Sequence, residues 1–356
     1  MEIEMELNSV RRFTVDEAME LFETDIIELG AMADRVRWQI NPEPAVTFVI
    51  DRNINYTNIC KSRCRFCAFY REAESGDAYL LSRDEIFRRI DEAIRLGATQ
   101  IMLQGGLNPE LGIEYFEDLF GSIKNRFDIH LHSLSPPEIV HIASISGLSI
   151  KETLSRLKCA GLDSLPGGGA EILEDRVRSR ISPNKITSRE WLGVMEEAHE
   201  IGMKTTATMM FGAGESRRDR ITHLNAIRDL QDKTGGFTAF IPWTFQPANT
   251  ELGKSMAAPK GTGGYEYLRT LAISRIFLDN FQNIQASWVT QGLKIAQIAL
   301  FTGANDLGST MIEENVVRAA GATFRANLSE LVGLIKEIGL EARQRDTLYQ
   351  RIIKVW

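Results

Sequence analysis

The cysteines of this chain gather in one stretch, Asn53-Ile-Asn-Tyr-Thr-Asn-Ile-Cys-Lys-Ser-Arg-Cys-Arg-Phe-Cys-Ala-Phe-Tyr-Arg71. It holds three of the four cysteines, Cys60, Cys64 and Cys67, in the spacing C-x3-C-x2-C. Three thiolates on one short loop can converge on a single metal centre, because the backbone can curl around it. Thiolates suit soft centres such as zinc or iron–sulfur clusters. The stretch therefore predicts a metal centre held by one loop.

The number of nearby ligands bears on which centre this is. A closed zinc site needs four protein ligands, but the nearest histidine is His130 and the fourth cysteine, Cys159, is far away in sequence. Three ligands on a four-iron cluster would leave one iron open to bind a substrate. Two other readings are open: a zinc site completed from elsewhere in the fold, and a set of ordinary buried thiols.

The motif C-x3-C-x-Phe-C resembles the signature of the radical S-adenosylmethionine (SAM) enzymes. The resemblance implies that Cys60, Cys64 and Cys67 hold a [4Fe-4S] cluster whose open iron chelates the methionine part of SAM. It also implies that Phe66 lies beside the adenine. The longer string N-Y-T-N-x-C…C-R-F-C-A-F-Y-R is similar to the menaquinone (futalosine-pathway) and deazaflavin branch of this superfamily.

Composition narrows the class of protein further. The chain has 356 residues and a net charge of −7 at pH 7, which gives no electrostatic case for binding nucleic acid. No apolar run is long enough to span a bilayer, and the acidic N-terminus lacks the pattern of a signal peptide. We therefore expect a cytoplasmic protein without membrane partners, in a compartment where thiols stay reduced.

The order of predicted elements indicates an α/β barrel. Residues 1–44 read as a helical cap, in which Thr14 and Glu17 have the spacing of a capping box. From residue 45 to 310, short apolar strands alternate with amphipathic helices, which predicts a (β/α)8 TIM-type barrel of the radical SAM kind. A partial barrel of six units is the alternative. Residues 311–356 are expected to form a C-terminal helical extension packed on the barrel, with helix over 329–352. The eight expected strands are 46–50, 100–103, 128–132, 162–165, 204–211, 237–241, 284–288 and 303–307.

In such barrels the active site lies at the carboxyl ends of the strands. The residues that follow each expected strand are therefore candidate site residues. Gly105 and Gly106 follow the second strand and would let the backbone approach a ligand closely, although a tight turn explains them equally. They resemble the Gly-Gly-Glu motif that binds the methionine part of SAM, except that Leu107 stands in the third place. The resemblance therefore supports the backbone contact and leaves the role of the glutamate unfilled.

The third expected strand contains two histidines. His130 and His132 alternate along it, so both side chains lie on the same side. A histidine pair there could orient a substrate or move a proton, or each could be a hydrogen-bonded structural residue. We favour His132 as the catalytic residue, because it lies nearer to the carboxyl end of the strand.

Later strand ends supply further candidates. Glu171 follows three consecutive glycines and is placed to accept hydrogen bonds from ribose hydroxyls, unless it is a solvated residue of a flexible loop. Trp243 lies in an aromatic segment, 242–247, that suits stacking on a flat ring but also core packing. Asn305 and Asp306 stand near the last strand and are candidate substrate-binding residues.

Four longer strings resemble the family of cyclic dehypoxanthine futalosine synthases: residues 161–173, 205–212, 235–247 and 305–314. The resemblance implies a cyclase of menaquinone biosynthesis that takes dehypoxanthine futalosine as substrate. A 5′-deoxyadenosyl radical would abstract hydrogen from C4′ of its ribose, and the resulting radical would add to the benzoate ring. The alternatives are an aminofutalosine synthase, a deazaflavin-pathway enzyme, and a non-enzyme that holds a structural iron–sulfur or zinc centre.

The implied reaction also needs partners. The resemblance implies a one-electron donor such as flavodoxin or ferredoxin. The benzoate carboxylate of the substrate calls for a cationic partner. Arg71, just after the cysteines, is our candidate, although arginines are also common on surfaces.

Overall fold

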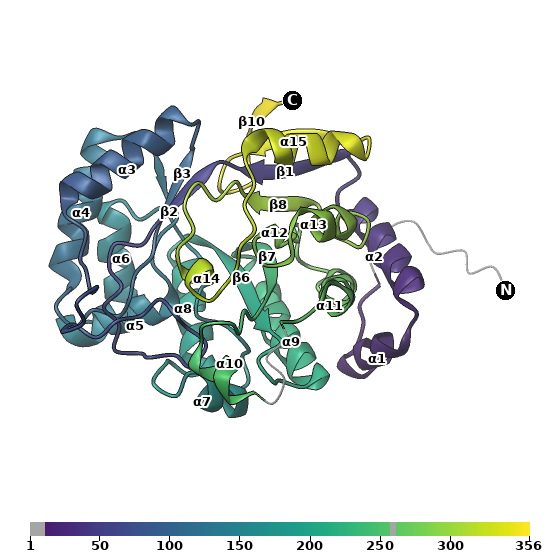
Figure 1. Ribbon diagram of the computed structural model, residues 1–356, viewed down its shortest axis with the longest axis horizontal. Helices are drawn as coiled ribbons and strands as arrows, with labels where there is room; N and C mark the ends of the chain where they lie inside the picture. Colours follow the sequence, from purple (N-terminus) through teal and green to yellow (C-terminus); the bar gives the residue numbers. More distant parts are fainter. Residues whose placement is uncertain (1–10, 257–260) are drawn as a thin grey trace.

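The computed structural model describes residues 11–256 and 261–356, so the first ten residues of the predicted N-terminal cap lie outside it. In the described part, parallel strands lie inside a ring of helices (Figure 1). The strands of this barrel are β1 (Ala45–Val49), β2 (Asp51–Ile54), β3 (Gln100–Leu103), β4 (His130–Leu131), β5 (Ser164–Leu165), β6 (Lys204–Phe211), β7 (Phe237–Thr244) and β8 (Asp306–Ser309).

The strands close into a ring. β1 and β2 follow one another with one residue between them and together make the first barrel strand. Parallel pairing joins β2 to β3 and β4, joins β5 to β6 and β7, and joins β8 to β1. A bridge between His132 and Ser164 connects β4 to β5. Residues 284–285 then pair with Phe240 of β7 and with Asp306 of β8, and so replace a full strand. The predicted eight-unit barrel is therefore confirmed, and the partial barrel of six units is not what the chain forms.

The predicted seventh strand is shorter than expected. Only two of its residues, 284–285, form bridges, and α12 (Trp288–Gln291) begins three residues later. The indole Nε1 of Trp288 donates a hydrogen bond to the carbonyl of Ser309 in β8. The side chain thus turns the segment toward the barrel, and an extended strand through residue 288 was the wrong prediction.

Helices separate the strands as the sequence predicts, because each carries an apolar face toward the sheet. The predicted helices are α3 (Arg83–Arg95), α4 (Ile113–Arg126), α5 (Pro136–Ser146), α6 (Ile150–Ala160), α8 (Ser188–Glu200), α9 (Arg217–Thr234), α11 (Gly264–Phe277) and the shorter α13 (Leu293–Ala299). Besides α12, the short helices α7 (Asp175–Ile181), α10 (Glu251–Ser255) and α14 (Val316–Ala319) were not predicted. None of the described helices combines the length and apolar character that crossing a bilayer requires.

The N-terminal cap is helical, as predicted. It consists of α1 (Val15–Glu20), the 3-10 turn η1 (Leu21–Glu23) and α2 (Ile26–Ile40). The predicted capping box begins α1: Thr14 Oγ1 accepts a hydrogen bond from the backbone N–H of Glu17, and the Glu17 carboxylate accepts one from the Thr14 N–H. Two donors that a helix start leaves unpaired are satisfied in this way.

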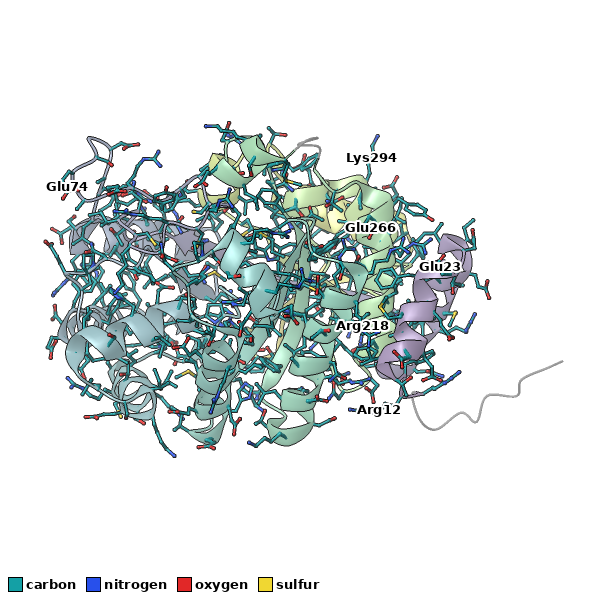
Figure 2. The ribbon with its side chains drawn as sticks, turned by 90° about the horizontal axis from the view of Figure 1, so that it is seen from below. Arg12, Glu23, Glu74, Arg218, Glu266 and Lys294 are labelled. Carbon is teal, nitrogen blue, oxygen red and sulfur yellow. The ribbon has the colours of Figure 1, made fainter. Side chains whose placement is uncertain are left out.

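The cap packs beside α9 and α11 at one side of the barrel (Figure 1). Ion pairs cross this contact, and Figure 2 shows Arg12 and Arg218 at it. Arg12 lies 3.0 Å from Asp279, and Arg218 lies 3.4 Å from Asp16. Such exposed pairs contribute little. The buried side chain of Phe22 and its apolar neighbours hold the cap in place.

The C-terminal extension corrects the sequence prediction. Helix α15 (Leu328–Glu337) is present, but the chain then forms β9 (Glu341–Arg345) and β10 (Ile352–Val355) instead of continuing as helix to residue 352. Gly339 has φ +77° and turns the chain out of the helix. Beyond Gly339 the backbone pairs with an open sheet edge, so tertiary pairing makes residues 341–345 a strand.

That open edge belongs to β1. The edge of β1 that does not face β8 pairs with β9, in parallel and in register from Ala45 with Glu341 to Phe48 with Gln344. Three residues further along, from Asp51, β2 pairs with β3 instead. Gln344 Nε2 also donates to the carbonyl of Gly97, just before β3. Strand β9 therefore fills a wedge between β1 and the start of β3, and β10 covers it in antiparallel pairing.

A buried ion pair holds this arrangement together. Asp306 of β8 is fully buried, and Arg345 at the end of β9 is only 3% exposed. Arg345 grips the carboxylate with two hydrogen bonds, Nε to Oδ2 at 2.6 Å and Nη2 to Oδ1 at 3.1 Å. Thr47 Oγ1 and the Gly308 N–H also donate to Asp306. The guanidinium stacks on the ring of Tyr349, 3.7 Å from its centroid.

Replacing Asp306 tests how much this ion pair contributes to the free energy of unfolding. Asp306→Asn would leave Arg345 buried without its counter-charge, and breaking such a pair costs about 3–5 kcal/mol. We expect a clearly lower midpoint of urea unfolding, followed by circular dichroism. The control Asp91→Asn removes the exposed partner of Arg95 and should shift the free energy of unfolding by under about 1 kcal/mol. Equal midpoints for the two variants would contradict this role of the pair.

Candidate active site

A cavity of about 410 Å³ lies inside the barrel. It is lined by the cysteine loop (residues 55–71), by residues that follow β3, β4 and β5, and by the segment 285–290. The C-terminal segment adds Arg345, Thr347 and Tyr349. The sequence rule that places the site at the strand ends therefore located the cavity, although it did not foresee the contribution of the C-terminus.

The cysteine loop is curled and pinned at both ends. Cys60 N–H donates to the carbonyl of Arg71 at 3.0 Å, and Cys67 N–H donates to that of Cys64 at 3.0 Å. All three cysteines of the loop have free thiols and line the cavity. Cys159 is exposed on α6 and is not among the lining residues. The thiols that the spacing singled out are thus brought together without the fourth.

The thiols line one cavity without surrounding a point. Within residues 11–256 and 261–356, no three His, Cys, Asp or Glu side chains are placed to hold a metal ion. The fit of a centre therefore rests on the donor set. Cys60, Cys64 and Cys67 line the cavity, whereas Cys159 is exposed and does not. Three thiolates match a [4Fe-4S] cluster with one open iron, whereas a closed zinc site takes four protein ligands.

Burial determines the protonation of these thiols. It raises the pKa of Cys64 to about 11, against the lowering effect of the Lys185 charge. It also raises the pKa of Cys67, although the N–H groups of Phe69 and Tyr70 donate to that sulfur. Without a metal the thiols of Cys64 and Cys67 are therefore neutral at pH 7. Iron binding would displace their protons, since coordinated thiols are deprotonated.

The two glycines after β3 have a packing role. A Cβ on Gly105 would lie 2.6 Å from the ring of Tyr56, and one on Gly106 would lie 2.1 Å from the carbonyl oxygen of Ile59. Gly106 therefore lets the cysteine loop rest on the end of β3. Both glycines line the cavity, but their N–H groups already donate to Glu138 and to the backbone. Their contact with SAM stays a prediction.

Glu171 is a buried residue of the cavity wall, not a solvated loop residue. It is 4% exposed, and its Oε1 accepts a hydrogen bond from Lys185 Nζ at 2.9 Å. Arg178 Nη1 lies 3.7 Å from Oε2, which is buried and has no hydrogen-bond partner among residues 11–256 and 261–356. The carboxylate therefore presents one unused acceptor at the cavity. A ribose hydroxyl of SAM would satisfy it, so the residue fits the predicted role.

Lys185 was not foreseen. It lies in the loop between α7 and α8, where no local pattern marks it as functional. Burial opposes its charge, but Cys64 and Glu171 outweigh that effect and raise the pKa of Lys185. Its Nζ lies 5.2 Å from the ring centroid of Phe66, which also lines the cavity. A fixed cation therefore stands beside the cysteine loop.

The two histidines meet at one serine. His132 Nδ1 and His130 Nε2 each lie 2.7 Å from Ser164 Oγ, so the two side chains share one side of β4, as predicted. His132 is buried and lines the cavity, whereas His130 does not. Burial, together with the nearby His130 and Arg345, lowers the pKa of His132 to about 3. His132 is therefore neutral at physiological pH.

Arg71 does not reach the cavity. Its Nε donates to Asp77 at 2.6 Å, and its Nη1 donates to the carbonyls of residues 68–70. The guanidinium thus clamps the segment that follows Cys67. The cations that do line the cavity are Lys185 and Arg345.

Asn305 and Asp306 are likewise absent from the cavity lining. Asn305 Oδ1 accepts hydrogen bonds from Arg275 Nη2 at 2.8 Å and from the N–H of Ile284 at 3.0 Å, which fixes the narrow part of the barrel. Asp306 affects the cavity only through its pair with Arg345. Both predicted substrate contacts are therefore structural in this fold. Trp243 of β7, in contrast, lines the cavity as expected of a stacking residue.

Glu138 is a further lining residue that the sequence did not reveal. Burial raises its pKa to about 7, against hydrogen bonds from Ser135, from the N–H of Gly105 and from Tyr56. In the sequence it stands in the first turn of α5, where an acidic residue usually stabilises the helix by interacting with the helix dipole. Nothing in the local pattern distinguishes a buried carboxyl from that common role.

Family profiles agree with this site. The radical SAM superfamily matches residues 54–227, and the CofH/MqnC C-terminal region matches residues 234–354. Fold and site together define a radical SAM enzyme, which uses a [4Fe-4S] cluster and S-adenosylmethionine. The chain belongs to the CofH/MqnC branch of this superfamily.

Curated relatives match almost end to end. The cyclic dehypoxanthine futalosine synthase of Halalkalibacterium halodurans is 48% identical, over 96% of this chain and 92% of its own. That of Streptomyces coelicolor is 46% identical, over 96% and 86%. The 5-amino-6-(D-ribitylamino)uracil–L-tyrosine 4-hydroxyphenyl transferase of Methanopyrus kandleri is 41% identical, over 95% and 97%. Two different reactions are thus named among similar chains.

Solved structures support the fold. Methylornithine synthase (PylB) matches with a TM-score of 0.73 at 16% identity, over 93% of this chain and 94% of its own. The FeFe-hydrogenase maturase HydG from Carboxydothermus hydrogenoformans matches with a TM-score of 0.75 at 18% identity, over 97% and 79%. At such identities the likeness concerns the fold alone.

The ligand assignment makes a direct prediction. Cys64→Ala should abolish nearly all iron bound on anaerobic reconstitution, because one of three cluster ligands is gone. Cys159→Ala is the matched control and should retain both iron and activity, since its thiol is exposed. Iron and sulfide analysis of folded protein decides the matter. Loss of the cluster in the Cys159 variant would show that the ligand set is wrong.

Proposed function

We propose that this chain is a radical SAM cyclase that converts dehypoxanthine futalosine to cyclic dehypoxanthine futalosine in menaquinone biosynthesis. The observation that carries the proposal is the 48% identity, over 96% of the chain, to a relative of that name. The enclosed cavity suits a small-molecule substrate. We also propose a cytoplasmic location and a one-electron donor such as flavodoxin or ferredoxin.

The proposed reaction is an oxidative ring closure. When bound, the cluster and SAM supply a 5′-deoxyadenosyl radical. The substrate loses a hydrogen atom from C4′ of its ribose, and the carbon radical adds to the benzoate ring. Loss of one electron and one proton then restores aromaticity and leaves a spiro product. The barrel holds the reacting carbons close together and excludes water and other hydrogen donors.

Residues near the cysteine loop are assigned to the cofactors. Cys60, Cys64 and Cys67 would hold the cluster. Phe66 would lie beside the adenine, and Glu171 Oε2 would accept a ribose hydroxyl, because this buried oxygen has no other partner. The turn at residues 105–106 would face the methionine part of SAM.

Residues further along the cavity are assigned to the substrate. Trp243 would stack on a ring of the substrate. Lys185 and Arg345 support a substrate that carries a carboxylate, since both cations line the same cavity. His132 would take the final proton, because its imidazole is neutral and lines the cavity.

A second candidate is the deazaflavin-type reaction. The archaeal relatives named as 4-hydroxyphenyl transferases are 41–43% identical, only slightly less than the cyclases. Tyrosine also carries a carboxylate, so the two cations of the cavity do not separate these substrates. Aminofutalosine synthase, with a related radical chemistry, is the remaining alternative.

Glu171 allows a test of the SAM assignment. Glu171→Gln should weaken SAM binding at least about tenfold, because a charge-assisted hydrogen bond contributes roughly 1.5–3 kcal/mol. The iron content should stay unchanged. The control Glu174→Gln alters a nearby residue whose side chain makes no capping bond. Equilibrium dialysis with labelled SAM measures both, and equal affinities would remove Glu171 from the SAM site.

Isotope transfer tests the reaction itself. With dehypoxanthine futalosine deuterated at C4′, deuterium should appear in 5′-deoxyadenosine, and the product should have lost two hydrogens. Mass spectrometry of both compounds provides the measurement. If the nucleoside of SAM is incorporated into the product, the chain is an aminofutalosine synthase. Turnover only with tyrosine and 5-amino-6-(D-ribitylamino)uracil would favour the deazaflavin reaction.

A further inference from the structure

The shared contacts of Ser164 suggest more than packing. Ser164 is the first residue of β5, is almost fully buried, and lies within 2.7 Å of both His132 Nδ1 and His130 Nε2. The backbone fixes this meeting, because His132 and Ser164 form the bridge that joins β4 to β5. Ser133 N–H donates to the Ser164 carbonyl at 3.1 Å. Three proton-carrying groups therefore stand in a fixed row.

We propose that His132, Ser164 and His130 form a proton relay, which carries the proton released at the end of the reaction from the cavity to the opposite end of the barrel. This proposal rests on the proposed function for the origin of the proton. It adds Ser164 and His130 as positioning and transfer residues to a site in which His132 alone was assigned.

The hydroxyl gives the row a direction. A serine hydroxyl has one proton, so between two imidazoles it donates to one and accepts from the other. When His132 carries its proton on Nδ1, Ser164 accepts it and donates to Nε2 of His130. Nε2 of His132 is then unprotonated, and in the part of the chain that the structure describes the ring's side-chain hydrogen bond is made by Nδ1, so Nε2 is left for the cavity. This is the tautomer that can accept a proton inside the cavity.

The two ends of the row lie in different surroundings. His132 lines the cavity, and its charged neighbours are His130 and Arg345. His130 stands outside the cavity lining, is half-buried, and faces Asp163, Lys124 and Asp346. His130 begins β4, so it lies at the amino end of the strands, whereas the cysteine loop follows the carboxyl end of β2.

The charges favour transfer outward. Burial lowers the pKa of both histidines. At His132, His130 and Arg345 lower it further, so a proton cannot stay there. At His130, the carboxylates of Asp163 and Asp346 raise the pKa, which offsets the lowering by Lys124. A proton taken up by His132 therefore moves toward His130 and on to solvent.

The proton balance is complete. A C–H bond of the cyclised radical breaks and its proton goes to Nε2 of His132, while one electron passes to an acceptor of the iron–sulfur class. The Nδ1 proton of His132 passes to Ser164, the hydroxyl proton passes to Nε2 of His130, and the Nδ1 proton of His130 passes to water. Both rings end in the opposite tautomer and return to the first by exchange with water between turnovers.

The tautomers can be measured without substrate. We would record nitrogen NMR spectra of the full-length, cluster-loaded chain labelled with ¹⁵N-histidine, whose five histidines are assigned by single His→Gln variants. We expect the His132 proton on Nδ1 at pH 7, and loss of this preference in Ser164→Ala. A proton on Nε2 of His132 in the parent chain would overturn the relay.

Turnover then separates transfer from packing. In Ser164→Ala and in His130→Ala, 5′-deoxyadenosine formation should stay within about twofold, while cyclised product falls at least about tenfold, since a positioned base contributes 10²–10⁴-fold. Added imidazole should restore product in His130→Ala. The control His199→Gln removes a histidine that also lies between two hydroxyls, those of Thr205 and Thr234, but outside the cavity.

The outcomes are distinguishable. A parallel fall of 5′-deoxyadenosine and product, without rescue by imidazole, would mean that the row is structural and would overturn the relay. If the parent chain forms 5′-deoxyadenosine but no cyclised product, the proposed function fails. The tautomer measurement still decides the relay in that case.

Discussion

The ion pair between Asp306 and Arg345 is the contact on which both the barrel and its cavity depend. A charge that leaves water costs several kcal/mol unless it is paired, so neither side chain could be buried alone. Asp306 belongs to the last barrel strand, and Arg345 comes from β9, which fills the wedge beside β1. Closing the barrel and docking the C-terminus are therefore one event. The same guanidinium then lines the cavity, so the C-terminal strand is part of the site as well as of the fold.

A second buried pair balances the first. Glu171 and Lys185 join the loop after β5 to the loop before α8, beside the cysteine loop. Each pair cancels its own charge but leaves hydrogen-bonding capacity at the cavity, such as the free Oε2 of Glu171. The pairs therefore hold polar groups at fixed points of the cavity wall. That suits radical chemistry, in which loosely held water or a mobile hydrogen donor would quench the intermediate.

Sequence reasoning succeeded where local pattern and topology suffice. The cysteine spacing singled out three thiols that line one cavity, and the rule of strand ends identified Glu171, His132 and Trp243, which line it too. It failed where tertiary partners decide. Arg71 is close to the cysteines in sequence, but the carbonyls of its own loop use its guanidinium. Arg345 was hidden because residues 341–345 have no strong strand pattern and become a strand only by pairing with the open edge of β1. Spacing along a chain cannot reveal such an edge.

The geometry also bears on how the last step of the proposed reaction is organised. Restoring aromaticity requires that a proton and an electron leave the same ring. The cysteine loop lies at the carboxyl ends of the strands, and His130 lies at the amino end of β4. With a single base beside the cluster, the proton would remain near the SAM site and near the Lys185 cation, where a positive charge is unfavourable. The row from His132 through Ser164 leads away from both. With separate exits, the proton and the electron would each leave the site without passing the other. This arrangement would explain why two histidines of one barrel strand contact the same serine.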